Sequence, residues 1–321
     1  MYLAVLKQLG IMTVIVIAGF IFAKITKVGE KEQQFLSKML LYFINPCLVF
    51  SSFNKPFELL KLQQLGFVIL ISFLSFLLTI GVSILTTLFS KKNKTPEEIE
   101  QKKSYAVIER LAIVFTNCGF VGIPLINGIF GQEGVFYLMG YLVVFNVLLW
   151  TWGYWQMAGK INLKKIITNP NIIAVCCGLI LFCLPFQLPE PIAKPISMIG
   201  DLNTAVAMIL IGILFSNFHF DSSKILGLVR CICVRLILCS IVTLSFITLV
   251  YFLFGNHIQN AQMMLMVVLI CSMCPSATSV PSLSVIFGKD TSYASLLVSV
   301  SSIVCIITVP SFVALAGIFI K

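Results

Sequence analysis

The sequence predicts an all-α membrane protein with ten transmembrane helices, arranged as two inverted five-helix repeats with broken, crossing helices four and nine. Three observations predict this fold: a very apolar composition, ten apolar runs of membrane-spanning length, and two matched helix breaks. Apolar residues make up 59% of the chain and charged residues 11%, whereas soluble domains have about 45–50% and about 25%. Too few charged side chains remain to cover a water-facing surface. The composition therefore excludes a soluble enzyme, a disordered chain and a disulfide-stapled secreted module.

Ten runs are long enough to cross a bilayer core, which takes about 20 apolar residues in a helix. In chain order they are Tyr2–Ala23, Phe35–Phe53, Leu65–Phe89, Tyr105–Phe130, Val135–Met157, Asn171–Leu188, Ile196–Phe215, Ile232–Phe254, Ala261–Phe287 and Tyr293–Ile320. The runs are continuous rather than alternating, which argues against transmembrane strands. No connection is long enough for a soluble domain. We therefore expect a single transmembrane domain over residues 1–321, with one repeat over about residues 1–158 and the other over about residues 166–321.

Basic residues are distributed unevenly between the two sides of these runs. Seventeen of the 22 Lys and Arg residues fall on one side, including the cluster in the Ser90–Ser104 loop and Arg235 near the start of the eighth run. The positive-inside rule makes that side cytoplasmic. We therefore expect a multi-pass protein of the cell membrane with both termini outside. The net charge of +10 reflects this topology and does not indicate nucleic-acid binding.

Helix-breaking residues interrupt the fourth and ninth runs in matching patterns. Residues 117–124 and 274–281 are both eight residues long and end in proline, at Pro124 and Pro281. Each proline is followed at the same distance by Ile-Phe-Gly, and the offset between the two copies is 157 residues throughout. Paired interruptions in corresponding positions mark the binding sites of transporters. Because five spans is an odd number, the second repeat must enter the membrane with the opposite orientation.

The two breaks predict a binding site for an anion. Gly119 and Gly122 weaken the helix, and Pro124 and Pro281 lack a backbone N–H and suit the first turn of a new half-helix. Two half-helix N-termini with unpaired N–H groups should then meet near the midplane of the membrane. Irregular backbone survives at that depth only where it is buried in protein or lines a cavity. Helix N-termini at a cavity favour an anionic ligand.

Three stretches of the sequence resemble a known family, the auxin efflux carrier family of membrane permeases. They are residues 116–125 (TNCGFVGIPL), 144–153 (VFNVLLWTWG) and 169–174 (NPNIIA) with Gly178-Leu179. The resemblance implies a ten-span inverted-repeat carrier, similar in fold to bile-acid sodium symporters and sodium/proton antiporters, that moves organic anions. The short loop between spans five and six favours a bacterial-type permease of the malate or malonate kind over the plant exporters of auxin. One departure is Ala205, where members often carry proline.

Candidate substrate-binding residues surround the breaks and three further polar positions within the runs. They are Asn117, Gly119, Gly122, Pro124, Cys274, Pro275, Ser276, Thr278, Ser279, Pro281, Asn45, Pro46, Asn146, Asn203 and Thr204. Asn117 is the strongest, because its amide can donate to a carboxylate. The alternatives stay open at this point: a local helix cap for Asn117 and the hydroxyl residues, and helix–helix packing for Asn45, Asn146, Asn203 and Thr204.

No enzyme or metal chemistry is apparent. Cys271 and Cys274 have redox or metal spacing but no His or carboxylate nearby, and His219 and His257 fall at opposite membrane faces. We therefore expect a carrier, not an enzyme, with no cofactor and no metal. Its partners are a small organic carboxylate and the lipid bilayer. The sequence leaves open Na⁺ or proton coupling, import or export, a homodimer, and the different function of a membrane sensor that transports nothing.

Overall fold

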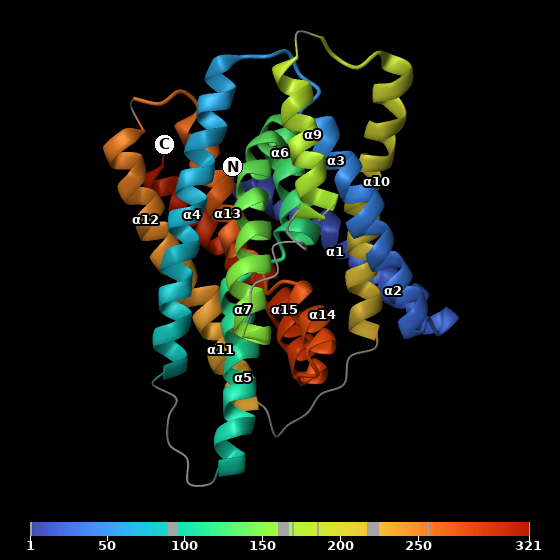
Figure 1. The fold of residues 1–321 in the computed structure, drawn as a ribbon, viewed down its shortest axis with the longest axis vertical. Coiled ribbons are helices and arrows are strands. Elements are labelled where there is room, and N and C mark those ends of the chain that lie inside the picture. Colours follow the sequence, from blue (N-terminus) through green and yellow to red (C-terminus); the bar gives the residue numbers. More distant parts are fainter. Residues whose placement is uncertain are drawn as a thin grey trace. The chain divides into compact units, whose positions relative to one another are not determined.

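The computed structural model describes residues 2–88, 96–159, 167–168, 170–184, 186–216, 225–255 and 257–320. All regular elements of this part of the chain are helical, and it contains no β-strand, only one isolated β-bridge (Figure 1). The helical elements are α1 (Tyr2–Thr26), α2 (Glu30–Met39), η1 (Leu40–Ile44), α3 (Asn45–Ser52), α4 (Leu59–Leu88), α5 (Pro96–Val114), η2 (Cys118–Gly122), α6 (Ile123–Leu148), η3 (Leu149–Gly153), α7 (Tyr154–Ala158), α9 (Pro170–Cys183), α10 (Glu190–Ser216), α11 (Ile225–Cys233), η5 (Val234–Leu238), α12 (Cys239–Phe254), α13 (Ala261–Met273), α14 (Ser279–Ile286) and α15 (Thr291–Phe319). The elements labelled η are π-helical turns. Residues 90–95 of the expected Ser90–Ser104 loop lie outside the described residues, whereas residues 96–104, expected as loop, form the first turns of α5.

Seven helical stretches of the described chain are long and apolar enough to cross a membrane. The number differs from the ten expected spans because three expected spans are not continuous helices of full length. The ninth is split into α13 and α14, the sixth is the short helix α9, and the fourth is interrupted after α5.

One stretch of 41 residues, Cys118–Ala158, is too long for a single crossing. A helix of that length measures about 60 Å, twice the thickness of about 30 Å of a bilayer core. Inside it Gly131 has φ 63° and ψ −158°, which no helix accommodates, so two helices meet at a kink there. The kink falls between the expected ends of spans four and five.

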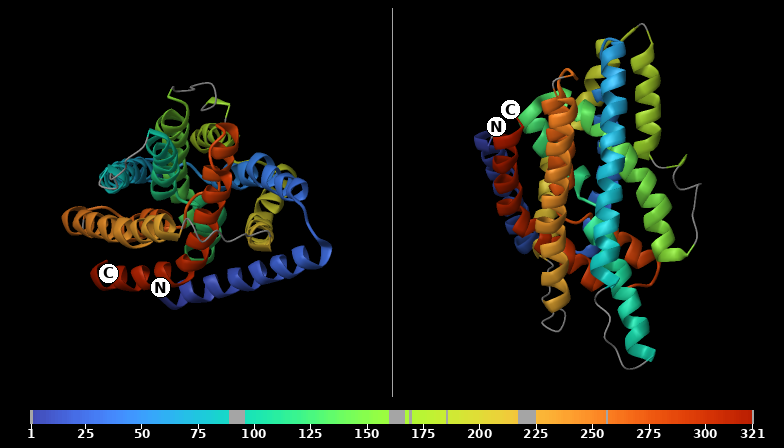
Figure 2. Two further views of the ribbon diagram at one scale, coloured as in Figure 1. Left: turned by 90° about the horizontal axis from the view of Figure 1, so that it is seen from below. Right: turned by 90° about the vertical axis from the view of Figure 1, so that its left-hand side faces the viewer.

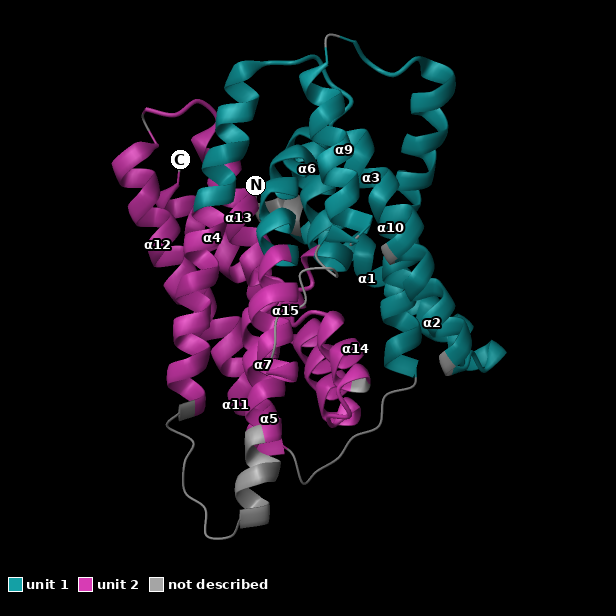
Figure 3. Cartoon of the chain, viewed as in Figure 1, with its two compact units in different colours: residues 1–70, 119–146, 163–218 teal, residues 71–118, 147–162, 219–321 magenta. Residues whose placement is uncertain are grey.

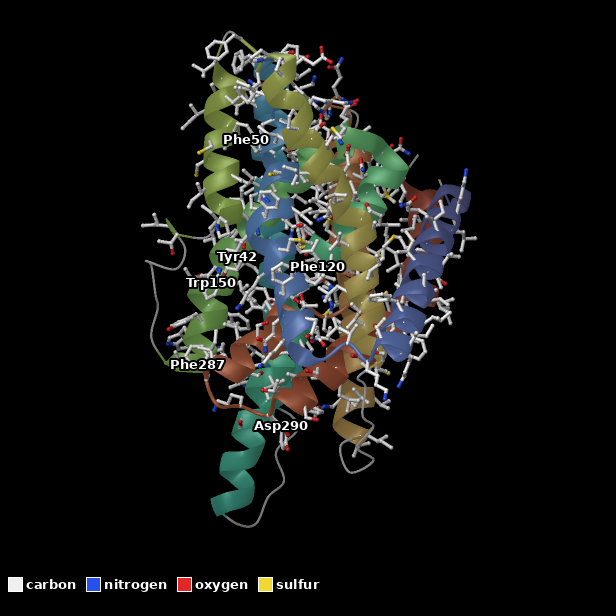
Figure 4. The ribbon with its side chains drawn as sticks, turned by 90° about the vertical axis from the view of Figure 1, so that its right-hand side faces the viewer. Tyr42, Phe50, Phe120, Trp150, Phe287 and Asp290 are labelled. Atoms are coloured by element: carbon white, nitrogen blue, oxygen red, sulfur yellow. The ribbon has the colours of Figure 1, made fainter. Side chains whose placement is uncertain are left out.

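Gly131 has a counterpart with a similar positive φ. Gly288 follows α14 and has φ 61°. Only glycine adopts this left-handed region without a steric penalty, and it is the usual residue just past the end of a helix. The two Ile-Phe-Gly motifs that were matched in sequence therefore both end on a glycine with a positive φ. Phe287, on the second motif, and Asp290, which caps α15 by accepting from the Tyr293 N–H at 2.9 Å, lie in this turn (Figure 4).

The helices group into two compact units, each assembled from separate segments of the chain (Figure 3). Unit 1 contains residues 1–70, 119–146 and 163–218, and unit 2 contains residues 71–118, 147–162 and 219–321. The division passes through α4 and through the first predicted break, between Cys118 and Gly119. The two parts of the fourth apolar run therefore fall in different units.

Unit 1 is held together by close helix crossings. α1 packs against α10 (Figure 2), and α3 packs against both α10 and α9. At Gly212 a Cβ atom would lie 2.2 Å from the carbonyl oxygen of Val16, and at Gly200 it would lie 2.8 Å from the Cα of Leu48. Such contact of backbone on backbone requires glycine, and small residues at helix crossings are typical of membrane helices.

Unit 2 is organised around its C-terminal helix. α15 contacts α5, α11, α12, α13 and α14, and α12 packs along α13. α13 is deeply enclosed, since eleven of its 13 residues are buried. The polar groups of the second break therefore lie in the interior of the unit, surrounded by protein.

Candidate functional site

Both predicted breaks are present; the first lies further toward the N-terminus than expected, whereas the second lies within its predicted run. α5 ends at Val114, residues 115–117 are not helical, and the π-helical turn η2 begins at Cys118. In the second copy, α13 ends at Met273 and α14 begins at Ser279. Gly119 and Gly122, expected to break the helix, therefore lie inside η2. We call residues 115–117 and 274–278 the crossover segments.

The crossover segments pair with each other within unit 2, and this pairing explains why the helices stop. The Asn117 N–H donates to the carbonyl oxygen of Pro275 at 2.7 Å, and the Ala277 N–H donates to that of Phe115 at 2.9 Å. Thr116 and Ser276 form an antiparallel β-bridge. Backbone groups that would otherwise continue the helices are satisfied by the other segment, as groups removed from water must be.

Side chains also fix the second segment in place. The Ser276 hydroxyl donates to the carbonyl oxygen of Ala112 at 2.8 Å, and its N–H donates to the Ser301 hydroxyl at 3.1 Å. The Cys274 thiol donates to the carbonyl oxygen of Ile270 at 3.4 Å. Ser276 and Cys274 therefore hold the backbone of the break, the local role that was left open for the hydroxyl residues.

A buried arginine, Arg235, occupies the centre of the crossover. Its side chain is 1% exposed. Nη1 donates to the carbonyl oxygen of Ile113 at 2.9 Å, Nη2 to those of Ser272 at 2.5 Å and Cys274 at 2.8 Å, and Nε to Cys274 at 3.2 Å. The guanidinium thus binds the C-terminal ends of both broken helices, α5 and α13.

The sequence analysis placed Arg235 wrongly, among the cytoplasmic basic residues. It lies inside the apolar stretch Ile225–Phe254, on the π-helical turn η5. The sequence does contain a signal, because an ionisable residue within a membrane helix indicates a functional position. Its proximity to the boundary of the eighth run concealed that signal.

The remaining predicted residues of unit 2 lie at the start of α14. Asn117 is 4% exposed. Ser279 is the first residue of α14, and its hydroxyl oxygen is buried with no hydrogen-bond partner in the part of the chain that is described. Thr278 is half-buried, and Pro281 lies in the first turn, as expected. A buried hydroxyl without a partner is costly unless a ligand or water uses it.

In unit 1, two asparagines from different helices meet. The Asn203 amide on α10 donates to the Asn45 side-chain oxygen on α3, and both residues are buried. They are 158 residues apart, close to the repeat offset of 157 residues. The Asn45 Nδ2 atom also lies beside Gly119. A Cβ atom added to this glycine would lie 3.9 Å from Asn45 Nδ2. Asn45, Asn203 and the start of the second half of span four therefore form one polar group.

The other predicted residues of unit 1 are placed on or beside these helices. Pro124 is the second residue of α6, and its carbonyl oxygen accepts from Gln8 Nε2 at 3.2 Å. Asn146, 6% exposed, donates to the carbonyl oxygen of Leu142 on its own helix at 2.8 Å. Pro46 follows Asn45 in the first turn of α3, and Thr204 follows Asn203 on α10. Phe120, inside η2, and Phe50, on α3, are labelled in Figure 4.

A second ionic group in unit 2 was not predicted as a site. The Glu109 carboxylate on α5 is buried, forms an ion pair with Arg230 on α11, and accepts from the Tyr293 hydroxyl on α15 at 2.9 Å. The ion pair joins α5 to α11, and the hydrogen bond from Tyr293 adds α15, so we interpret the group as a structural link between three helices.

Unit 1 contains a pocket of about 230 Å³. It is lined by residues of α3 and α10, such as Ser51 and Lys194, and by Asn54 just after α3, and it contains no predicted site residue.

Comparison with protein families gives one match, and it covers residues 4–313. The matching family is described as membrane transport protein, and it is the auxin efflux carrier family whose motifs the sequence resembles. A comparison with curated proteins finds no match.

Proposed function

The chain belongs to the membrane transport protein family, and from that premise we propose that this transporter moves a small organic carboxylate by alternating access. The family accounts for transport across a membrane, and several apolar helices agree with a multi-pass protein. The carboxylate, the ten-span inverted repeat and the location in the cell membrane with both termini outside are our proposal.

The observation that carries the proposal is the pairing of the two crossover segments. Non-helical backbone at membrane depth is tolerated where it is buried in protein or lines a cavity, and transporters bind their substrates at such discontinuous helices. The antiparallel bridge between Thr116 and Ser276 and the shared positive φ of Gly131 and Gly288 support two copies of one motif running in opposite directions.

The polar groups near the breaks favour an anion. η2 and α14 each begin directly after a crossover segment, so their first backbone N–H groups have no preceding turn to bond to. Such helix starts attract negative charge. The Asn117 amide, the Ser279 hydroxyl and the Asn45–Asn203 pair are neutral donors suited to a carboxylate. Within unit 2 we assign the binding role to Asn117 and Ser279 and the supporting role to Ser276, Pro275 and Cys274. Within unit 1 we assign a binding role to Asn45 and Asn203 as a separate polar group.

The test is an uptake screen in proteoliposomes containing the full-length protein. We expect time-dependent flux of one or more radiolabelled dicarboxylates or aromatic monocarboxylates, and no flux of an amine of matched size. Protein-free liposomes give the background. A reconstituted, folded protein that moves none of these carboxylates would reject the proposed substrate class, and flux of the amine alone would reject the anion site. A membrane sensor would move neither compound.

A further inference from the structure

We propose that Arg235 is a built-in cation that takes the place of a coupling Na⁺ at the crossover, so that this carrier works without Na⁺. The inference rests on the proposed function, since it concerns the ion requirement of the same transport cycle. It settles a question that the sequence leaves open, namely whether the backbone carbonyls at the breaks hold Na⁺.

The oxygens around the guanidinium are of the kind that bind Na⁺ in other carriers. Unwound carbonyls and the C-terminal ends of half-helices coordinate Na⁺ at discontinuous membrane helices. Here the carbonyl oxygens of Ile113, Ser272 and Cys274 come from the ends of two such helices and converge within 2.5–3.2 Å of the nitrogens of one side chain. The positions that a metal cation would need are therefore already filled by a covalently attached one.

The charge of Arg235 is balanced by these helix ends. Among the described residues no carboxylate forms an ion pair with it, because Glu109 pairs with Arg230 instead. The C-terminus of a helix carries roughly half a negative charge, so the ends of α5 and α13 together offset about one positive charge. An arginine remains protonated at all physiological pH values. The balance is therefore permanent, whereas a bound Na⁺ would come and go with each transport cycle.

The same geometry separates Arg235 from the substrate. Nε, Nη1 and Nη2 all donate to backbone carbonyls, so the guanidinium holds the two helix ends together and acts as a positioning residue. The position one repeat earlier, at the same offset of 157 residues, is Leu78, which is apolar and 38% exposed. The built-in cation is thus present in only one of the two copies.

Thermal unfolding of the full-length protein tests the proposal without any substrate. We compare NaCl with choline chloride at equal ionic strength, and add methylguanidinium at concentrations far below denaturing levels. The wild type should unfold at the same temperature in both salts. Arg235→Ala leaves a cavity lined by carbonyl oxygens, so it should unfold at a lower temperature in choline and regain about 2–4 °C with saturating Na⁺ or methylguanidinium. Arg110→Ala is the matched control and should show no cation-specific gain, because the Arg110 guanidinium donates to the neutral side chains of Thr87 and Gln156.

Arg235→Lys keeps the experiment decisive if Arg235→Ala does not fold. Its ammonium still brings one positive charge to the carbonyl oxygens, so it should fold and show no Na⁺-specific shift. A Na⁺-specific shift in the wild type or in Arg235→Lys would overturn the proposal, and so would a folded Arg235→Ala protein that responds to neither cation. These outcomes do not depend on transport, so they remain distinct from a failed uptake screen, which would reject the carboxylate substrate instead.

Discussion

Asn117 uses its backbone and its side chain for different purposes. Its N–H pairs with Pro275 in the other crossover segment, which leaves the side-chain amide as the group that distinguishes it from any other residue at this position. The earlier alternative, a local helix cap, concerns only the backbone of α5 and η2. Substitution of the side chain therefore separates the two roles.

Replacement of Asn117 by Ala should weaken substrate binding about 10- to 150-fold. Loss of one hydrogen bond to a charged group costs about 1.5–3 kcal/mol, and the backbone bond to Pro275 does not need the side chain. Binding is measured by isothermal titration or by competition in proteoliposomes. Asn127→Ala, in α6 and outside the predicted site, is the control. Unchanged affinity in a stably folded Asn117→Ala protein would remove this residue from the site.

The hydrogen bond between Asn45 and Asn203 predicts an energetic coupling. Because each residue is buried and the bond joins α3 to α10, the two single Ala variants should lose stability and the double variant should lose less than their sum. Hydrogen bonds between membrane helices average about 0.6 kcal/mol and reach about 1.7. A double-mutant cycle of unfolding in mixed micelles measures this coupling. Strict additivity would show that the pair contributes nothing beyond each residue alone.

At the scale of single residues, the sequence could predict the polar positions but not their partners. Asn117, Asn45 and Asn203 stand out because polar side chains are rare in apolar runs. Which backbone carbonyl Ser276 or Arg235 meets depends on contacts across more than a hundred residues, such as the one between Arg235 and Ile113. No local pattern encodes those contacts.

At the scale of elements, π-helical turns accompany the candidate site. η1 directly precedes Asn45, η2 follows Asn117, and η5 contains Arg235. Such turns are rare and occur mostly at functional sites. The sequence predicted breaks from Gly and Pro but could not predict these turns, because their extra residue per turn leaves the apolar composition unchanged. This is why the first break was placed a few residues too late.

Replacement of Pro124 by Ala tests the role of the break itself. The new N–H can donate to a carbonyl in the preceding turn η2, so the junction of η2 and α6 should become more regular. Transport should fall even if expression rises, since a stiffer helix opposes the conformational cycle. Flux per folded molecule is the measurement, and Pro195→Ala, at an exposed proline within α10, is the control. Equal flux in the wild type and Pro124→Ala would show that this proline is not needed for transport.

At the scale of the whole molecule, composition predicts an apolar, helical membrane protein, and the structure agrees. The ten-span inverted repeat and the orientation stay predictions. The orientation depends on the basic asymmetry, and Arg235 no longer counts toward it, because it lies within a helix. The remaining asymmetry is still large, with the Ser90–Ser104 cluster unaffected.

A cysteine in the Ser90–Ser104 loop should therefore react with an impermeant thiol reagent only after cells are opened. Asn93→Cys is suitable because its neighbours are basic and polar. The 11 native cysteines are free thiols, so the experiment needs a background in which they are replaced. A cysteine at Lys55, between the second and third expected spans, is the control and should react in intact cells. Labelling of Asn93→Cys in intact cells would reverse the orientation.

The driving force follows from the charges that the site holds. Proton-coupled carriers use a carboxylate or histidine within the membrane. Glu109, the buried carboxylate of unit 2, is bound by Arg230 and Tyr293, and the predicted site consists of neutral donors, while Arg235 keeps its charge. From these groups we expect the proposed carboxylate to cross with its negative charge uncompensated by a proton or Na⁺. We therefore expect electrogenic movement of the anion. An interior-negative potential contributes about 2.3 kcal/mol per charge per 100 mV and favours export.

Substrate-induced current in proteoliposomes tests this expectation. With a substrate gradient and no ion gradient, addition of substrate should produce a current whose sign is that of a moving anion. The current should be the same in Na⁺ and in choline, and should follow only the ionisation of the substrate itself as pH is varied. An inhibited or empty membrane gives the baseline. Flux that is electrically silent, or that requires a Na⁺ or proton gradient, would replace uniport with coupled transport. A loss of current on replacing Na⁺ would in addition contradict the role given to Arg235, because a fixed guanidinium at the crossover leaves no step for Na⁺ to drive.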